Sequence, residues 1–87
     1  MNISFTETAW QDYLYWQTQD KKTLKRINQI LSDIERHGND GIGKPEALKE
    51  DLSGWWSRRI DDANRLIYQI ENDKIIISHC WTHYGDK

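Results

Sequence analysis

The chain has 87 residues and a mass of 10.4 kDa, with 37% hydrophobic, 30% charged and 11% aromatic residues. A chain of this length buries only roughly 60 to 65% of its unfolded surface, so we expect one domain over residues 1–87 with a small core. Twelve basic and fourteen acidic side chains give a net charge of -2, which argues against a broad electrostatic contact with nucleic acid. Any contact with RNA or DNA must therefore be local.

The cysteine and histidine content limits the chemistry further. Cys80 is the single cysteine, so no intramolecular disulfide can form, and three histidines do not provide a zinc-type ligand array. We therefore expect neither a metal nor a cofactor. The N-terminal segment lacks a basic region followed by a long apolar run, and no stretch of about 18 apolar residues occurs. These signals predict a cytoplasmic protein that does not span a membrane.

The N-terminal segment predicts a strand and then a helix. Ile3 and Phe5 fall on one face of an extended segment, which indicates a strand over residues 1–5. Thr6 can accept a hydrogen bond from the free backbone amides of a following helical turn. Apolar residues then recur at helical spacing, which predicts a helix over residues 7–18.

A second helix is expected between Asp20 and Gly38. Asp20 can cap its first turn, and Gly38 can end it because glycine readily adopts the left-handed conformation. The apolar residues between them form one stripe, which consists of Leu24, Ile27, Ile30, Leu31 and Ile34. We expect this stripe to pack on a sheet, with the charged residues of the opposite face in solvent.

The remaining chain is rich in strand-forming residues. Glycines and a proline in residues 39–46 predict a loop. Aromatic and β-branched residues then concentrate in residues 55–60, 65–70 and 74–81, which indicates an antiparallel meander. In the last segment, strict alternation places one set of side chains on each face: Ile75, Ile77, His79 and Trp81 on one, and Ile76, Ser78 and Cys80 on the other. The element order predicts an α+β domain with both helices on one side of the sheet.

Two arginines flank the first predicted turn of the meander. Arg59 and Arg65 share a face of the sheet if the strand register places them directly opposite each other, and the sequence does not determine that register. Two arginines at the mouth of a hairpin are more often a solvated pair than a phosphate-binding pair. Both interpretations are therefore open.

One carboxylate and one imidazole, together with the arginines, suit a reaction that needs no metal. His83 can transfer a proton near neutral pH, Tyr84 could donate a hydrogen bond or stack on a base, and Glu46 could share acid–base work with a histidine. In RNA cleavage by the 2′-hydroxyl group, a base takes the hydroxyl proton, a cation stabilises the phosphorane, and an acid protonates the leaving 5′ oxygen. Taken singly, each of these residues is more often a surface or packing residue.

Five sequence blocks follow one another along the chain: DYLYW at 12–16, GKPEALK at 43–49, LSGWWSRRI at 52–60, RLIY at 65–68 and HY at 83–84. Together they resemble YoeB/Txe-type toxins of the RelE superfamily, over about residues 1–84. The resemblance implies a microbial-RNase-like α+β fold, with two N-terminal helices on one face of an antiparallel sheet. It also implies a type II toxin that enters the ribosomal A site, cuts mRNA there and inhibits translation. A cognate antitoxin protein would neutralise it, and a homodimer is possible.

The same resemblance implies roles for individual residues. Glu46 is similar in position to the general base, Arg65 to the phosphorane-stabilising cation and His83 to the general acid. Tyr84 would orient the substrate. Supporting phosphate contacts would come from Lys49 and Arg59.

The chain departs from the family pattern near its C-terminal end. The family commonly has an arginine shortly before the His–Tyr pair, whereas this chain has Trp81 and Thr82, so one cationic contact is missing and Trp81 could stack instead. Residues 85–87 also extend beyond the tyrosine at which relatives often end. The alternative function is a non-enzymatic binding toxin on the same scaffold, similar to the gyrase poisons of the wider superfamily. Such a binder has no chemical need for Glu46 and the His–Tyr pair.

Overall fold

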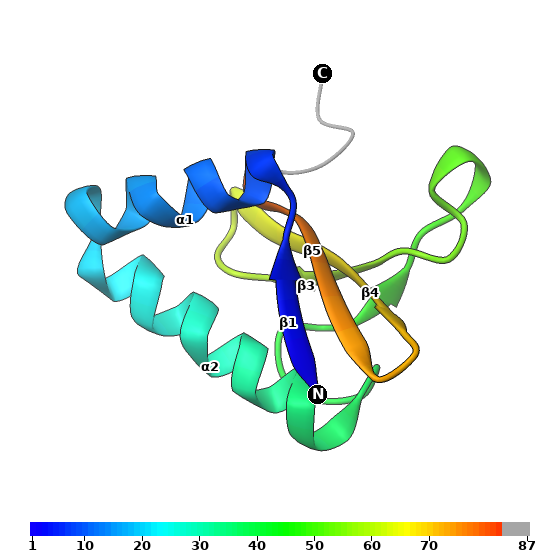
Figure 1. Cartoon of the computed structure of the whole chain (residues 1–87). Coiled ribbons are helices and arrows are strands. Elements are labelled where there is room, and N and C mark those ends of the chain that lie inside the picture. Colours follow the sequence, from blue (N-terminus) through cyan, green and yellow to red (C-terminus); the bar gives the residue numbers. More distant parts are fainter. Residues whose placement is uncertain (83–87) are drawn as a thin grey trace.

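The computed structural model describes residues 1–82. Its elements in chain order are β1 (Asn2–Phe5), α1 (Glu7–Gln19), α2 (Lys21–His37), β2 (Glu46–Ala47), a short 3₁₀ helix η1 (Glu50–Leu52), β3 (Trp56–Arg59), β4 (Asn64–Glu71) and β5 (Lys74–Thr82). The strands form one sheet in the order β1-β5-β4-β3-β2, in which β1 is parallel to β5 and the other pairs are antiparallel (Figure 1). The predicted α+β architecture is therefore confirmed.

Side-chain caps fix where the two helices begin. The hydroxyl of Thr6 accepts a hydrogen bond from the backbone N–H of Ala9 at 3.1 Å. The Asp20 carboxylate accepts hydrogen bonds from two backbone N–H groups in the first turn of α2. Gly38 follows the end of α2 with a φ of 66°, in the region that favours glycine. The predicted boundaries at Asp20 and Gly38 are confirmed, and α1 continues one residue past the prediction, to Gln19.

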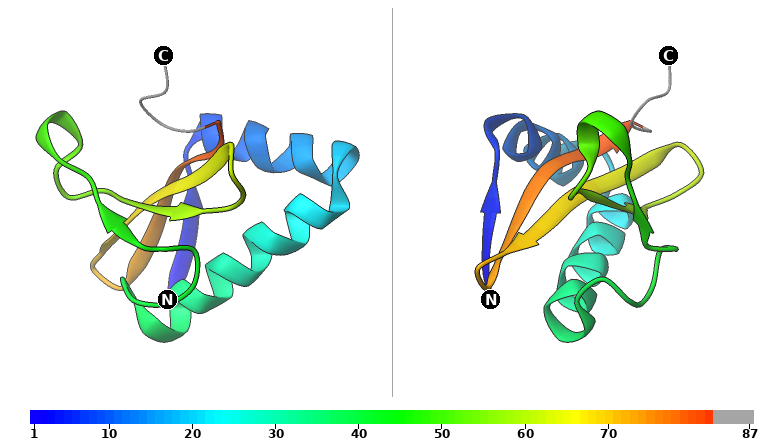
Figure 2. Two further views of the ribbon diagram at one scale, coloured as in Figure 1. Left: turned by 180° about the vertical axis from the view of Figure 1, so that it is seen from behind. Right: turned by 90° about the vertical axis from the view of Figure 1, so that its right-hand side faces the viewer.

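The core lies between the sheet and the helices. Four members of the predicted stripe on α2 are buried, and they pack in one cluster with residues of β4 and β5. Figure 1 shows α1 and α2 meeting in a V on one side of the sheet. Figure 2 shows the segment after α2, drawn in green, returning past the end of this helix to the outer edge of the sheet. Within the described residues 1–82, neither helix is long and apolar enough to cross a membrane.

Helix α1 covers the part of β5 that β1 leaves unpaired. The hydroxyl of Thr6 donates to the carbonyl oxygen of Ser78 at 3.0 Å. Asp12 Oδ2 accepts a hydrogen bond from the Cys80 N–H at 3.1 Å, and Trp16 Nε1 donates to the Cys80 carbonyl oxygen at 2.7 Å. These side chains replace a neighbouring strand, because backbone groups buried at a sheet edge need hydrogen-bond partners.

A bulge in β5 overturns part of the predicted alternation. The pairing of β4 with β5 skips Ser78, so this strand has one residue more than its partner at that point. An extra residue moves the following side chains to the opposite faces. Cys80 is therefore buried in the core with the two buried isoleucines of β5. The prediction that His79 and Trp81 share the face of those isoleucines is wrong.

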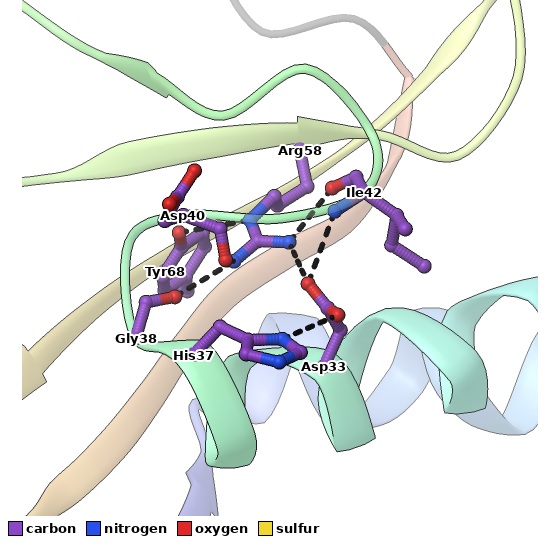
Figure 3. Close-up of polar contacts among 7 residues, drawn as sticks. All are labelled: Asp33, His37, Gly38, Asp40, Ile42, Arg58 and Tyr68. Carbon is purple, nitrogen blue, oxygen red and sulfur yellow. Dashed lines mark hydrogen bonds and ion pairs between the residues drawn. The ribbon is translucent and has the colours of Figure 1, made fainter.

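Arg58 is a fully buried cation that joins α2, the following loop and the sheet (Figure 3). Its Nη1 donates to Asp33 Oδ2 at 2.8 Å and to the Ile42 carbonyl oxygen at 2.7 Å. Its Nη2 donates to the Gly38 carbonyl oxygen at 2.7 Å, and its Nε donates to the Tyr68 hydroxyl at 3.1 Å. The loop that leads to β2 is thus held against β3 by one guanidinium group.

This network makes the free energy of unfolding depend on pH in the acidic range. The hydrogen bond from Arg58 lowers the pKa of Asp33 from 3.8 to about 2. Because the folded-state pKa lies below the unfolded value, the stabilisation is fully present above pH 3.8 and is lost as the pH falls toward about 2. We expect the difference in unfolding free energy between wild type and Asp33→Asn to shrink over this window. Urea denaturation of both proteins across the window measures it, and a constant difference would contradict the expectation.

Candidate active site

Strand register brings three of the predicted site residues to one face of the sheet. Glu46 of β2 pairs with Ser57 of β3, and Arg59 of β3 pairs with Arg65 of β4. Paired residues share a face, and so do residues two apart in one strand. Glu46, Arg59 and Arg65 therefore lie together on the face opposite Arg58 and the helices. The condition under which the two arginines share a face is met.

The strand register also gives the separation of Glu46 from Arg65 across the sheet. Two strand spacings of about 4.8 Å and two residues of about 3.3 Å put the Cα atoms of Glu46 and Arg65 roughly 12 Å apart. Glu46 and Arg59 are exposed, and Arg65 is half-buried. Within residues 1–82, Asp33 forms the salt-bridge contacts, one with Arg58 and one with His37. The Glu46 carboxylate forms no salt bridge with another described residue.

The Arg65 guanidinium is held by the loop between β3 and β4. Its Nη1 donates to the carbonyl oxygens of Asp61 at 2.7 Å, Asn64 at 3.0 Å and Asp62 at 3.3 Å. Within residues 1–82, every hydrogen bond of this group involves Nη1, so Nε and Nη2 remain available to a ligand. A guanidinium fixed at one nitrogen and open at the others is suited to binding an oxyanion.

The position of Glu46 depends on a short strand that the sequence does not predict. Backbone hydrogen bonds hold this segment beside β3 on both sides of Glu46, since Arg59 N donates to Gly43 O at 2.6 Å and Leu48 N donates to Trp55 O at 2.9 Å. Gly43 has a φ of 81°, and a Cβ atom there would lie 3.1 Å from the Arg59 carbonyl oxygen. Glycine therefore permits the close approach that places Glu46 at the edge of the sheet.

The remaining predicted site residues lie near the ends of these elements or beyond them. Lys49 is exposed and directly precedes η1, on the chain segment that continues from Glu46. His83 and Tyr84 lie outside the described residues, so their roles stay predictions. The last described pair of β5 is Thr82 with Asn64, the neighbour of Arg65.

Tyr15 forms an aromatic pair with Trp81 beside the arginines, and the sequence contains no separate indication of a role for Tyr15. Trp81 pairs with Arg65, so Arg59, Arg65 and Trp81 form one row across the exposed face. The Tyr15 ring of α1 stacks on Trp81 with a centroid distance of 4.5 Å. The sequence signal was the aromatic spacing in residues 12–16. A local pattern of this kind does not show that one of these rings contacts a strand far away in the sequence.

Known proteins resemble this chain over nearly its whole length. Residues 5–84 match the family described as "YoeB-like toxin of bacterial type II toxin-antitoxin system". "Toxin YoeB" of Synechocystis is 54% identical over 84 residues, which are 97% of this chain and 98% of that protein. The structure of a YoeB dimer from Staphylococcus aureus has a TM-score of 0.91 at 47% identity and covers 97% of this chain and 98% of that one.

A second solved structure contains a YoeB toxin in a different assembly. It is the YoeB–YefM complex from Staphylococcus aureus, with a TM-score of 0.91 at 46% identity over 97% of this chain and 98% of that one. Family, relatives and solved structures agree with each other and with the order of helices and strands described above. The chain belongs to the YoeB-like toxins of bacterial type II toxin–antitoxin systems.

Proposed function

We propose that this toxin is a ribosome-dependent endoribonuclease that cuts mRNA in the ribosomal A site and so inhibits translation. The observation that carries the proposal is the placement of Glu46, Arg59 and Arg65 on one sheet face of a YoeB-like chain, with Glu46 and Arg59 exposed and Arg65 half-buried. This arrangement supplies a carboxylate and two cations on the same face of the sheet. It also provides the local contact with RNA that the acidic net charge of -2 requires.

The proposed reaction uses the RNA's own 2′-hydroxyl group as the nucleophile and needs no metal. Glu46 takes the hydroxyl proton, and the 2′ oxygen attacks the adjacent phosphorus atom. The Arg65 guanidinium stabilises the negative charge of the phosphorane. His83 protonates the leaving 5′ oxygen, which gives a 2′,3′-cyclic phosphate and a free 5′-hydroxyl group.

Three further residues have supporting roles in this proposal. Arg59 lies directly opposite Arg65 and is exposed, and Lys49 is exposed on the segment that follows Glu46. Both side chains are placed to contact phosphates next to the scissile one. Tyr84 orients the substrate beside His83.

The partners of the relatives extend to this chain as part of the proposal. YoeB toxins of Staphylococcus aureus have been solved as a dimer and in complex with YefM. We propose that this chain likewise binds a cognate antitoxin protein and can form a homodimer. Its ribosomal substrate places it in the cytoplasm.

Mapping of mRNA 5′ ends in a purified translation reaction tests the proposed function. We expect new 5′ ends at the A-site codon when the toxin is present, and none when the same mRNA is incubated with the toxin but without ribosomes. A DNA supercoiling reaction with gyrase serves as the second arm. Inhibition of gyrase with no new mRNA ends would reject the endoribonuclease and favour the binding toxin.

A further inference from the structure

The cationic row on the exposed sheet face continues into an aromatic surface. Trp81 is the direct partner of Arg65 on β5, and Tyr15 of α1 stacks on Trp81. Trp81 and Tyr15 are each 39% exposed. A planar aromatic surface therefore stands one strand away from the guanidinium that we assign to the scissile phosphate.

The aromatic surface is held in a fixed orientation. The Tyr15 and Trp81 rings lie 4.5 Å apart at an interplanar angle of 18°, so they are stacked. Beneath them, Trp16 meets Trp81 edge-on at 6.2 Å and 70°. Trp16 is buried, and its Nε1 donates to the Cys80 carbonyl oxygen at 2.7 Å. A surface supported in this way loses little side-chain freedom when a ligand covers it.

A pocket whose lining includes three polar residues adjoins the same tryptophan. It has a volume of about 360 Å³ and is lined by Thr8, Asp12, His79 and Trp81. Oδ2 of Asp12 is already bound to the Cys80 N–H, and His79 Nδ1 lies 2.8 Å from the Ser78 hydroxyl. Thr8 is exposed. The pocket thus combines one large ring with hydroxyl, carboxylate and imidazole groups, which suits a flat polar ring.

We propose that Trp81, supported by Tyr15, stacks on an unpaired nucleobase of the RNA substrate next to the phosphate that Arg65 binds. The identity of the ligand as RNA rests on the proposed function. The placement of the base rests on the row formed by Arg59, Arg65 and Trp81, because a nucleic acid strand presents phosphates and flat rings side by side.

Another exposed tryptophan, Trp10 of α1, shows what the proposal distinguishes. Trp10 is 44% exposed, but its ring contacts are with Phe5 and Tyr13, and it has no place in the row of arginines. Exposure alone therefore does not mark a base-binding residue. The matched substitutions Trp81→Leu and Trp10→Leu remove the same ring from two surfaces of similar exposure.

Binding of modified RNA tests this proposal without any cleavage step. The probe is a fluorescently labelled single-stranded RNA with 2′-O-methyl riboses, which cannot be cut because the nucleophile is blocked. A series of such RNAs carries one abasic position each, and anisotropy measures their affinity for the full chain. We expect one abasic position to weaken binding to wild type by about 5- to 150-fold, the range for loss of one stacked base. In Trp81→Leu, the intact and abasic RNAs should bind equally.

Three control variants separate the loss of the Trp81 ring from other effects of substitution. Trp10→Leu should retain the wild-type abasic profile, Trp81→Phe should retain part of it, and Tyr15→Leu should reduce it while leaving Trp81 in place. Thermal unfolding of each variant shows whether it is folded. An abasic profile that is the same in wild type and Trp81→Leu, or wild-type binding no tighter than that of Trp81→Leu, overturns the proposal. A retained profile in a toxin that fails to cut mRNA would reject the proposed catalysis alone.

Discussion

Replacing Glu46 with glutamine is expected to slow mRNA cleavage in the purified translation reaction by about 10²- to 10⁴-fold. This loss corresponds to roughly 3 to 5 kcal/mol of activation free energy. The amide keeps the size and exposure of the side chain but cannot accept the 2′-hydroxyl proton. Because Glu46 is exposed and forms no ion pair within residues 1–82, the variant should fold with nearly unchanged stability. The rate of 5′-end formation, measured in single turnover, gives the effect directly.

Glu71→Gln is the matched control for this loss. Glu71 is an exposed glutamate at the end of β4 far from Arg65, where it pairs with Lys74. Its substitution should leave the cleavage rate unchanged. His83→Gln should lose activity over the same range as Glu46→Gln. Because the base and the acid act in one step, the rate loss in the double variant should be much smaller than the product of the two single-variant losses. Cleavage at the wild-type rate by either single variant removes that residue from the mechanism.

The largest loss of stability is expected from Arg58→Met. This substitution leaves the Asp33 carboxylate and the Gly38 and Ile42 carbonyl oxygens without their shared donor. Breaking a buried ion pair from one side costs about 3 to 5 kcal/mol. Total unfolding free energies of small domains are only about 5 to 15 kcal/mol. The urea concentration at the unfolding midpoint should therefore be much lower for the variant than for wild type. Urea denaturation followed by circular dichroism measures the change.

The neighbouring residue provides the control for this experiment. Arg59→Met makes the same substitution one position along β3, at an exposed side chain on the opposite face, and should change the unfolding free energy by no more than about 0.5 kcal/mol. A similar loss in both variants would show that methionine in β3 is harmful for reasons unrelated to the buried network. A loss below about 1 kcal/mol in Arg58→Met would contradict the role of the ion pair.

The elements that could be predicted are those whose signals are local. Asp20 and Gly38 mark the start and the end of α2 because capping depends on one side chain and on one backbone conformation. Four of the five residues in the apolar stripe of α2 are buried as expected, because an amphipathic helix buries the side chains that recur with its own period. Both kinds of signal are complete within a few turns of chain.

The features that escaped prediction depend on partners far away in the sequence. Ser78 is the inserted residue of the bulge in β5, and its carbonyl oxygen accepts a hydrogen bond from the distant Thr6. No residue pattern within 74–82 indicates the inserted position. β2 contains only two residues, and it exists because Gly43 can approach the backbone of Arg59. Short strands of this kind have too few residues to show an alternating pattern.

The candidate site shows the same division. The residue types at Glu46, Arg59 and Arg65 suggested phosphodiester chemistry, but their shared face is a property of strand register. Arg58 and Arg59 are adjacent and chemically identical, yet one is buried and the other exposed. Only the sheet, with its alternating faces, separates the cation that holds the fold from the cation available to a ligand.

The position of β5 inside the sheet, between two other strands, bears on when the toxin can become active. This strand lies between β1 and β4 and pairs with both, although it is formed by the last described residues of the chain. During synthesis, β1 and both helices emerge long before the strand on which they dock, so the domain cannot close until its C-terminal segment has left the exit tunnel. Under the proposed function, we therefore expect a nascent chain to be inactive on the ribosome that makes it and to be accessible to an antitoxin as it folds.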